Sequence, residues 1–121
     1  MSMRKVVLSK AGSDITSQLS GDAVKERVKE LILGGPVIFS KSYCPFCTKT
    51  KALFAKLGAQ VTAVELDQDK EGPAIQAALL QATGQRTVPS VFVGGHHIGG
   101  NDDVQGKAAS GELKTMLSAT E

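Results

Sequence analysis

The spacing of hydrophobic residues predicts alternating helices and strands from residue 22 onward. Between Asp22 and Leu33, hydrophobic side chains recur at helical intervals while Lys and Glu fill the other face, which predicts a helix. Gly34-Gly35 and then Pro36 indicate its end. The apolar, β-branched run that follows, Val37 to Ser40, predicts a short buried strand.

The alternation continues beyond residue 40. It predicts a helical run over 48–57 that stops at Gly58, a strand over 60–67, a helix over 73–81 that closes at Gly84, strands over 88–93 and 96–98 joined by a tight Gly94-Gly95 turn, and a last helical run with Leu113, Met116 and Leu117. Because a helix joins the first two strands, they should pair in parallel, and the last two should form a hairpin. The predicted fold class is α/β, with a four-stranded mixed sheet and helices on both faces.

Residues 99–102 are predicted to open the helix that follows the hairpin. The segment reads Gly-Gly-Asn-Asp, and short side chains such as those of Asn101 and Asp102 accept hydrogen bonds from the free N–H groups of a helix start. One of these two residues is therefore expected to be the N-cap.

Residues 1–21 fall outside this pattern. They contain one short apolar cluster, Val6 to Leu8, followed by small polar residues, and Asp14 is their only acid. We expect residues 1–21 to be a largely irregular N-terminal extension and residues 22–121 to form one domain. A remnant of an organellar transit peptide is the alternative interpretation of the extension.

Composition excludes several classes of function. The chain has 121 residues, of which 41% are hydrophobic and 21% charged, as in ordinary globular domains. A net charge of +2 is too small to indicate a nucleic acid partner. No apolar run reaches the ~20 residues that span a bilayer, and no secretory signal is visible. We expect a monomer that works in the cytoplasm, or in an organelle if the extension is a transit-peptide remnant.

Both cysteines lie in the motif Cys44-Pro45-Phe46-Cys47, where the first strand meets the next helix. Proline suits the first helical position, which makes Cys44 the predicted N-cap. There the helix dipole and free N–H groups favour the thiolate, and Lys41 and Lys49 add positive charge, so the pKa should fall below the ordinary ~8.5. Cys44 is the candidate nucleophile, and Cys47, one turn further along, is the candidate resolving thiol.

Zinc binding and a purely structural disulfide are the alternatives for this motif. Zinc needs about four protein ligands, and beyond the two cysteines the chain has only the adjacent His96 and His97. Neighbouring residues on a strand point to opposite faces, so no metal is expected. A disulfide between Cys44 and Cys47 would close a very short loop and would add little stability. Redox chemistry is therefore favoured.

Three motifs together resemble the glutaredoxin family, in its dithiol class with a Cys-Pro-Phe-Cys or Cys-Pro-Tyr-Cys site. They are Cys44-Pro45-Phe46-Cys47, Thr87-Val88-Pro89 and the segment from Gly99 to Asp103, in this order, and the resemblance runs from about Ala23 to the end. It implies a thioredoxin fold, a cis peptide bond before Pro89, and glutathione as the co-substrate. It also implies reduction of glutathionylated or disulfide-containing proteins.

The resemblance also implies a set of glutathione-binding residues. Val88 would pair through its backbone with the cysteinyl part of glutathione. Lys41 and Gln76, with help from Arg86, would meet the glycyl carboxylate, and the helix start would take the γ-glutamyl end. The whole implied set is Lys41, Tyr43, Phe46, Gln76, Arg86, Thr87, Val88, Pro89, Gly100, Asn101, Asp102 and Asp103.

The sequence departs from the family pattern at two positions. Asn101 stands where many members have a cysteine, so a third thiol is missing, and Phe46 stands where a tyrosine is commoner. The Phe46 ring can still cover the Cys44 sulfur. The alternative function is a homodimer that binds a [2Fe–2S] cluster through Cys44 and glutathione. Pro45 argues weakly against it, and a thioredoxin reduced by a reductase is a further, weaker alternative.

Overall fold

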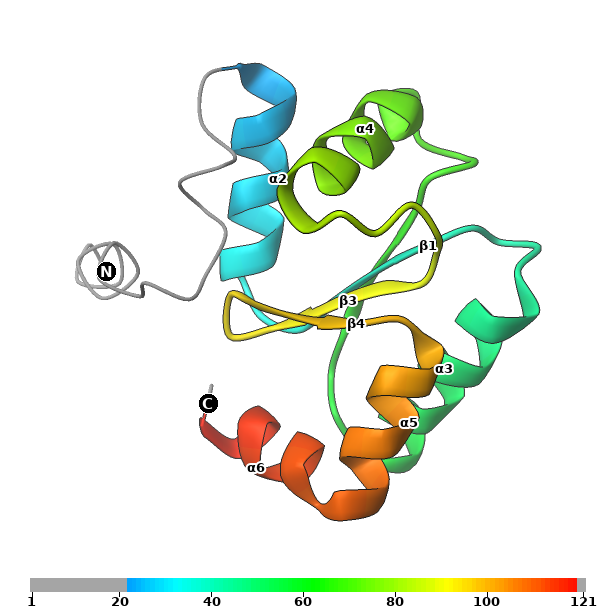
Figure 1. Cartoon of the computed structure of the whole chain (residues 1–121), viewed down its shortest axis with the longest axis vertical. Coiled ribbons are helices and arrows are strands. Elements are labelled where there is room, and N and C mark those ends of the chain that lie inside the picture. The colour runs from blue at the N-terminus through cyan, green and yellow to red at the C-terminus, as the bar shows by residue number, and fades with distance from the viewer. Residues whose placement is uncertain (1–21, 120–121) are drawn as a thin grey trace.

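The computed structural model describes residues 22–119, and the predicted N-terminal extension lies outside them. Figure 1 shows the elements in the predicted alternating order. They are α2 (Ala23–Leu33), β1 (Val37–Ser40), α3 (Pro45–Lys56), β2 (Thr62–Glu65), α4 (Gly72–Thr83), β3 (Ser90–Val93), β4 (His96–Gly99), α5 (Asn101–Ser110) and α6 (Glu112–Ala119).

The four strands form one mixed sheet in the order β2-β1-β3-β4. β1 pairs with β2 in parallel, Val37 opposite Thr62, and with β3 in the antiparallel direction. β3 and β4 form the predicted hairpin, in which Gly94 and Gly95 have φ values of 63° and 84°. Positive φ at both central residues suits the twist of a two-residue hairpin turn and explains the glycine pair.

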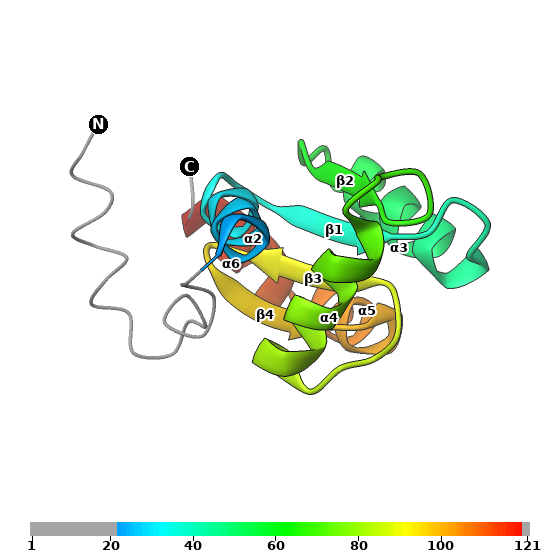
Figure 2. The same cartoon turned by 90° about the horizontal axis from the view of Figure 1, so that it is seen from above.

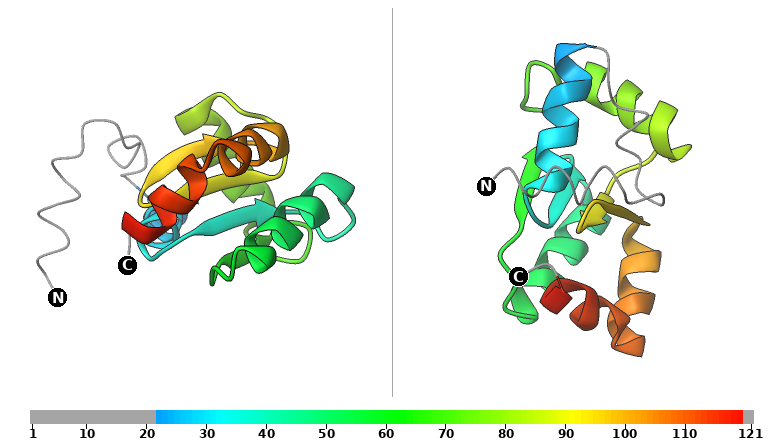
Figure 3. Two further views of the ribbon diagram at one scale, coloured as in Figure 1. Left: turned by 90° about the horizontal axis from the view of Figure 1, so that it is seen from below. Right: turned by 90° about the vertical axis from the view of Figure 1, so that its left-hand side faces the viewer.

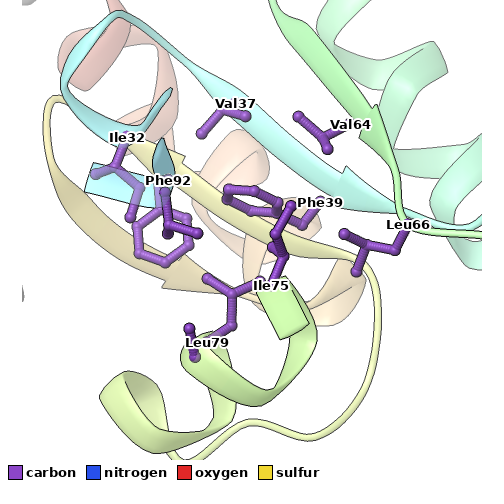
Figure 4. Close-up of a cluster of buried hydrophobic side chains, with 10 residues drawn as sticks. Ile32, Val37, Phe39, Val64, Leu66, Ile75, Leu79 and Phe92 are labelled. Carbon is purple, nitrogen blue, oxygen red and sulfur yellow. The ribbon is translucent and has the colours of Figure 1, made fainter. Parts of the chain in front are cut away.

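Helices cover both faces of the sheet, as predicted. Figures 1 and 2 show α2 and α4 on one face. Figure 3 shows α3, α5 and α6 on the opposite face. Each face has its own hydrophobic cluster: Phe39, Ile75 and Phe92 are fully buried on the α2 and α4 side (Figure 4), and Ile38, Phe54 and Leu113 on the other. No helix of residues 22–119 is long and apolar enough to cross a membrane.

Most helix limits follow the predicted signals. Asp22 caps α2 by accepting a hydrogen bond of 2.9 Å from the Lys25 N–H. Gly84, with φ of 79°, ends α4. Two strands are shorter than predicted. The strand predicted over 60–67 spans only Thr62–Glu65, and the one predicted over 88–93 spans only Ser90–Val93. In the second case Thr87, Val88 and Pro89 form a loop instead of pairing.

The predicted N-cap of the helix after the hairpin is wrong. The cap of α5 is Gly100, and neither Asn101 nor Asp102 occupies that position. The Asn101 side chain instead reaches α3, where its Oδ1 accepts a 2.9 Å hydrogen bond from the Thr50 hydroxyl. The Asp103 carboxylate accepts a hydrogen bond of 3.2 Å from the Gly100 N–H. A side chain from the first turn of α5 therefore pairs with a free N–H group at the start of the helix.

Candidate active site

Cys44 lies at the point where β1 passes into α3. It is the N-cap of α3, as predicted, and Pro45 occupies the first turn. The Cys44 Sγ accepts a hydrogen bond from the Cys47 N–H at 3.4 Å. Cys44 is half-buried and Cys47 is fully buried, and both thiols are free. This arrangement gives one accessible sulfur and one that only a neighbouring sulfur can reach.

The surroundings of the two thiols shift their pKa values in opposite directions. For Cys44, partial burial acts to raise the pKa, but hydrogen bonds from the Cys47 thiol and from the Cys47 and Phe46 N–H groups, with the charge of Lys51, lower it. For Cys47, burial raises the pKa and the neighbouring Cys44 adds to that effect. The thiolate therefore forms at Cys44, which is the sulfur open to a substrate.

A polar network that the sequence did not reveal lies beneath the thiols. The Lys51 Nζ is 2.5 Å from Glu65 Oε2 on β2, and Glu65 Oε1 accepts a 2.7 Å hydrogen bond from the buried Ser40 hydroxyl. Ser40 also helps to lower the pKa of Cys47 against the effect of burial. The charge of Lys51 contributes to the lowered pKa of Cys44, and the contribution expected from Lys41 and Lys49 stays a prediction.

The loop that precedes β3 faces Cys44. The Cys44 Sγ lies 3.9 Å from the Val88 carbonyl oxygen, and the Val88–Pro89 peptide bond is cis, as the resemblance implied. Pro89 is buried, Val88 is half-buried and Thr87 is exposed. The backbone of the loop and the thiol thus share one surface.

A groove of about 460 Å³ runs from this loop to the start of α5. It brings together eight of the predicted residues, and Gln85, which was not predicted, also lines it. The predicted residues that line it are Phe46, Thr87, Val88, Pro89, Gly100, Asn101, Asp102 and Asp103. The carboxylate of Asp103 is the one that accepts from the Gly100 N–H. Carboxylates from α5, backbone groups of the loop and an aromatic ring therefore line the same hollow.

The other predicted residues lie outside this groove. Gln76 on α4 donates a 3.2 Å hydrogen bond to the Arg86 carbonyl, so these two residues meet beside the loop. Tyr43 is 71% exposed. Lys41 contributes its backbone carbonyl to Cys44, 3.0 Å from the Cys44 N–H, and its charge helps to lower the pKa of Asp67 after the larger effect of hydrogen bonds from Ser42. Lys41 and Gln76 are half-buried and Arg86 is exposed, and that these three residues form a positive end of the groove stays a prediction.

Phe46 and Lys49 form a pair at the mouth of the site. The Lys49 Nζ lies 5.3 Å from the centre of the Phe46 ring, a distance at which a cation is attracted to an aromatic face. The ring is 53% exposed and lines the groove. That it shields the Cys44 sulfur stays a prediction.

The histidines do not join the cysteines. The ring of His97 on β4 contacts Phe92, with 4.9 Å between centres, and its Nε2 lies 3.3 Å from Ser90 Oγ and 3.0 Å from Gln85 Oε1. Across residues 22–119, no three His, Cys, Asp or Glu side chains come together in a way that could hold a metal ion. Gln85 and His97 carry no motif that sequence reasoning could have used, because their contact depends on the hairpin register.

A redox-active thiol pair at a helix start, opposite a cis-proline loop on a sheet of this topology, defines a thioredoxin-fold thiol–disulfide oxidoreductase. Residues 37–98 match the glutaredoxin family. A glutaredoxin of Solanum lycopersicum is 53% identical over 93 residues, which cover 76% of this chain and 86% of the relative. The chain belongs to the glutaredoxin family.

Solved structures agree with this assignment. A buckwheat glutaredoxin–glutathione complex has a TM-score of 0.77 and 51% identity, and the match covers 78% of this chain and 87% of that one. The holo form of glutaredoxin C1 from Populus tremula x tremuloides has a TM-score of 0.79 and 42% identity, covering 83% of this chain and all of the other. The thioredoxin fold implied by the sequence motifs is confirmed.

Proposed function

We propose that this protein is a glutathione-dependent oxidoreductase that reduces protein–glutathione mixed disulfides and protein disulfides. One observation supports this above others: Cys44, whose pKa is lowered, lies 3.9 Å from the Val88 carbonyl at the edge of a groove. A loop backbone beside a reactive sulfur suits a peptide-like thiol compound that binds as an added strand.

The first reaction uses Cys44 alone. Its thiolate attacks the glutathionyl sulfur of a mixed disulfide, the disulfide bond breaks, and the protein leaves as a thiolate that takes a proton from water. Cys44 is then bonded to glutathione. The thiolate of a second glutathione attacks the glutathionyl sulfur of that bond, which releases oxidised glutathione and regenerates the Cys44 thiolate. The net reaction converts one glutathionylated protein and one free glutathione into the protein thiol and oxidised glutathione. The low pKa of Cys44 makes it a good leaving group.

Protein disulfides require both thiols. Cys44 attacks one sulfur of the substrate and forms a mixed disulfide with it. Cys47 lies next to Cys44 and, once deprotonated, attacks the Cys44 sulfur, so that the second substrate thiolate leaves and a Cys44–Cys47 disulfide remains. The raised pKa of buried Cys47 keeps it protonated until this stage. One glutathione then opens the internal disulfide by forming a mixed disulfide with Cys44, and a second glutathione releases oxidised glutathione and regenerates Cys44.

Glutathione binding divides between the two ends of the groove. In this proposal the Val88 backbone pairs with the cysteinyl part, and the N–H groups at the start of α5 take the γ-glutamyl carboxylate. Asp103 meets the ammonium group, while Lys41, Gln76 and Arg86 meet the glycyl carboxylate. The remaining contacts are assigned to Tyr43, Phe46, Thr87, Pro89, Gly100, Asn101 and Asp102.

The test is a coupled assay with glutathione, NADPH and glutathione reductase on a small glutathionylated substrate. Turnover that depends on glutathione supports the proposal. Reduction by thioredoxin reductase alone would identify a thioredoxin-like protein instead. A stable brown dimer formed with iron, sulfide and glutathione, without turnover, would favour the cluster-binding alternative. Cytoplasmic location and the monomeric state stay predictions, which fractionation and sedimentation would test.

A further inference from the structure

The side chain of Gln85 runs alongside the loop that faces Cys44. Gln85 follows Gly84 at the end of α4, and its N–H donates to the Thr83 hydroxyl at 3.0 Å, which fixes its backbone. Its Nε2 donates hydrogen bonds of 2.8 Å to the Thr87 carbonyl and 2.8 Å to the Pro89 carbonyl. One amide therefore holds the residues on both sides of Val88.

The carbonyls that Gln85 contacts leave the Val88 carbonyl free to face Cys44. The carbonyls of Thr87 and Pro89 both accept from Gln85 and so face it, whereas the Val88 carbonyl between them faces the opposite side. On that opposite side lies the Cys44 Sγ, 3.9 Å from the Val88 oxygen. The Gln85 amide thus donates hydrogen bonds to the loop backbone on one side, as a neighbouring strand would. The Val88 carbonyl on the other side is directed toward the Cys44 thiol.

His97 determines how the Gln85 amide is oriented. The two carbonyls accept only from the NH₂ end, so the Gln85 Oε1 must face the other way, where His97 Nε2 lies 3.0 Å from it. Because that oxygen only accepts, His97 must carry its proton on Nε2. The pKa of His97 is lowered by burial against the opposing effect of Asp103, which favours the neutral ring. Ser90 Oγ, 3.3 Å from Nε2, and the Phe92 ring, 4.9 Å between centres, hold the imidazole in place.

We propose that Gln85, oriented by His97, is a positioning residue that fixes the Thr87–Pro89 segment and so presents the Val88 peptide to glutathione. The inference rests on the proposed function for the identity of the ligand, while the clamp itself rests on the contacts above. It assigns a role to two residues outside the cysteine motif. Neither residue touches the sulfur atoms in this arrangement, so the effect should fall on binding.

The decisive variant is Gln85→Met, which keeps the approximate size and adds no charge but removes both donors. Loss of two hydrogen bonds to the loop should raise the KM for a glutathionylated substrate roughly tenfold, with kcat and the pKa of Cys44 close to wild type. Gln81→Met is the matched control, because Gln81 is exposed on α4, the helix that ends just before Gln85. It should leave KM unchanged.

Two changes at His97 separate positioning from packing. His97→Phe keeps an aromatic ring beside Phe92 but removes the donor to Gln85, and it should raise KM a few-fold. His97→Gln restores an N–H donor and should return KM toward the wild-type value. If both variants raise KM equally, or if Gln85→Met lowers only thermal stability, the positioning role is wrong. The His97 pair also decides the matter if Gln85→Met does not fold.

An NMR measurement on the free, reduced protein distinguishes this inference from the proposed function. Gln85→Met should shift the Val88 amide resonance and speed its hydrogen exchange, while Gln81→Met should not, and His97 should show the Nε2–H tautomer. If wild type lacks turnover but the Val88 amide responds in this way, the clamp stands and the proposed substrate is wrong. If wild type turns over and the Val88 amide and KM are unaffected by Gln85→Met, the clamp is wrong and the function stands.

Discussion

The two faces of the sheet both use an ion pair to connect a helix to a segment near the sheet, but with different consequences. On one face, Arg27 of α2 lies 2.6 Å from Asp69 and 2.7 Å from Glu71 and ties α2 to the start of α4. On the other, Lys51 of α3 lies 2.5 Å from Glu65. Only Lys51 acts on a reactive group, because its charge contributes to the lowered pKa of Cys44. Two ion pairs of similar length therefore differ in their effect on reactivity, because only one of them lies near a reactive thiol.

The largest expected effect separates the two thiols on the reactive face. Cys44→Ser should abolish deglutathionylation and protein disulfide reduction, because a hydroxyl provides no thiolate. Cys47→Ser should keep deglutathionylation, and removal of the competing internal disulfide should favour that reaction, but it should lose most two-thiol reduction. Parallel assays with a glutathionylated substrate and a protein disulfide measure both. Deglutathionylation retained by Cys44→Ser and lost by Cys47→Ser would reverse the two roles.

A core substitution on the opposite face should affect stability alone. Ile32 of α2 is fully buried in the cluster with Phe39 and Phe92. Ile32→Ala should lower the free energy of unfolding by about 2–5 kcal/mol, because it removes buried methyl groups and leaves a cavity. Denaturant titration measures this loss, and the kcat of the folded fraction should match wild type. A large fall in kcat with intact stability would show that the two faces are coupled more closely than their separate clusters indicate.

The fold was readable from the sequence because its signals are local. Helical spacing, the glycine pairs and Pro45 determine where elements begin and end, and each depends on residues within a few positions. The cap of α5 was not readable, because Asn101 is drawn instead to Thr50, which is distant in sequence. Lys51, Ser40, Glu65, Gln85 and His97 were missed for the same reason: their contacts appear only when β1, β2 and β4 are aligned. The roles predicted for the glutathione-binding residues stay predictions.

A comparison of two lysines tests the electrostatic side of this argument. Lys51→Met should raise the pKa of Cys44, because one of the causes that lower it is removed. The rate of Cys44 alkylation falls as pH drops through this pKa, so the fall should move to higher pH in the variant. Lys41→Met is the matched control of equal charge change. A larger shift for Lys41→Met than for Lys51→Met would show that Lys41 is the main cation supporting the thiolate.

The smallest effect is expected at Arg27, and it should depend on pH. The hydrogen bond from Arg27, followed by that from the Glu71 N–H, lowers the pKa of Asp69 to about 2. A carboxyl whose folded pKa is depressed stabilises the fold above its unfolded pKa of ~3.9, and the contribution is lost as pH falls toward the folded value. Wild type should therefore lose this stability between about pH 4 and pH 2.

Arg27→Met should be slightly less stable at neutral pH, where exposed ion pairs contribute little, and should lose less over the acid range. Thermal unfolding at several pH values measures both, and alkylation of Cys44 should be unchanged, because this ion pair lies on the face without the thiols.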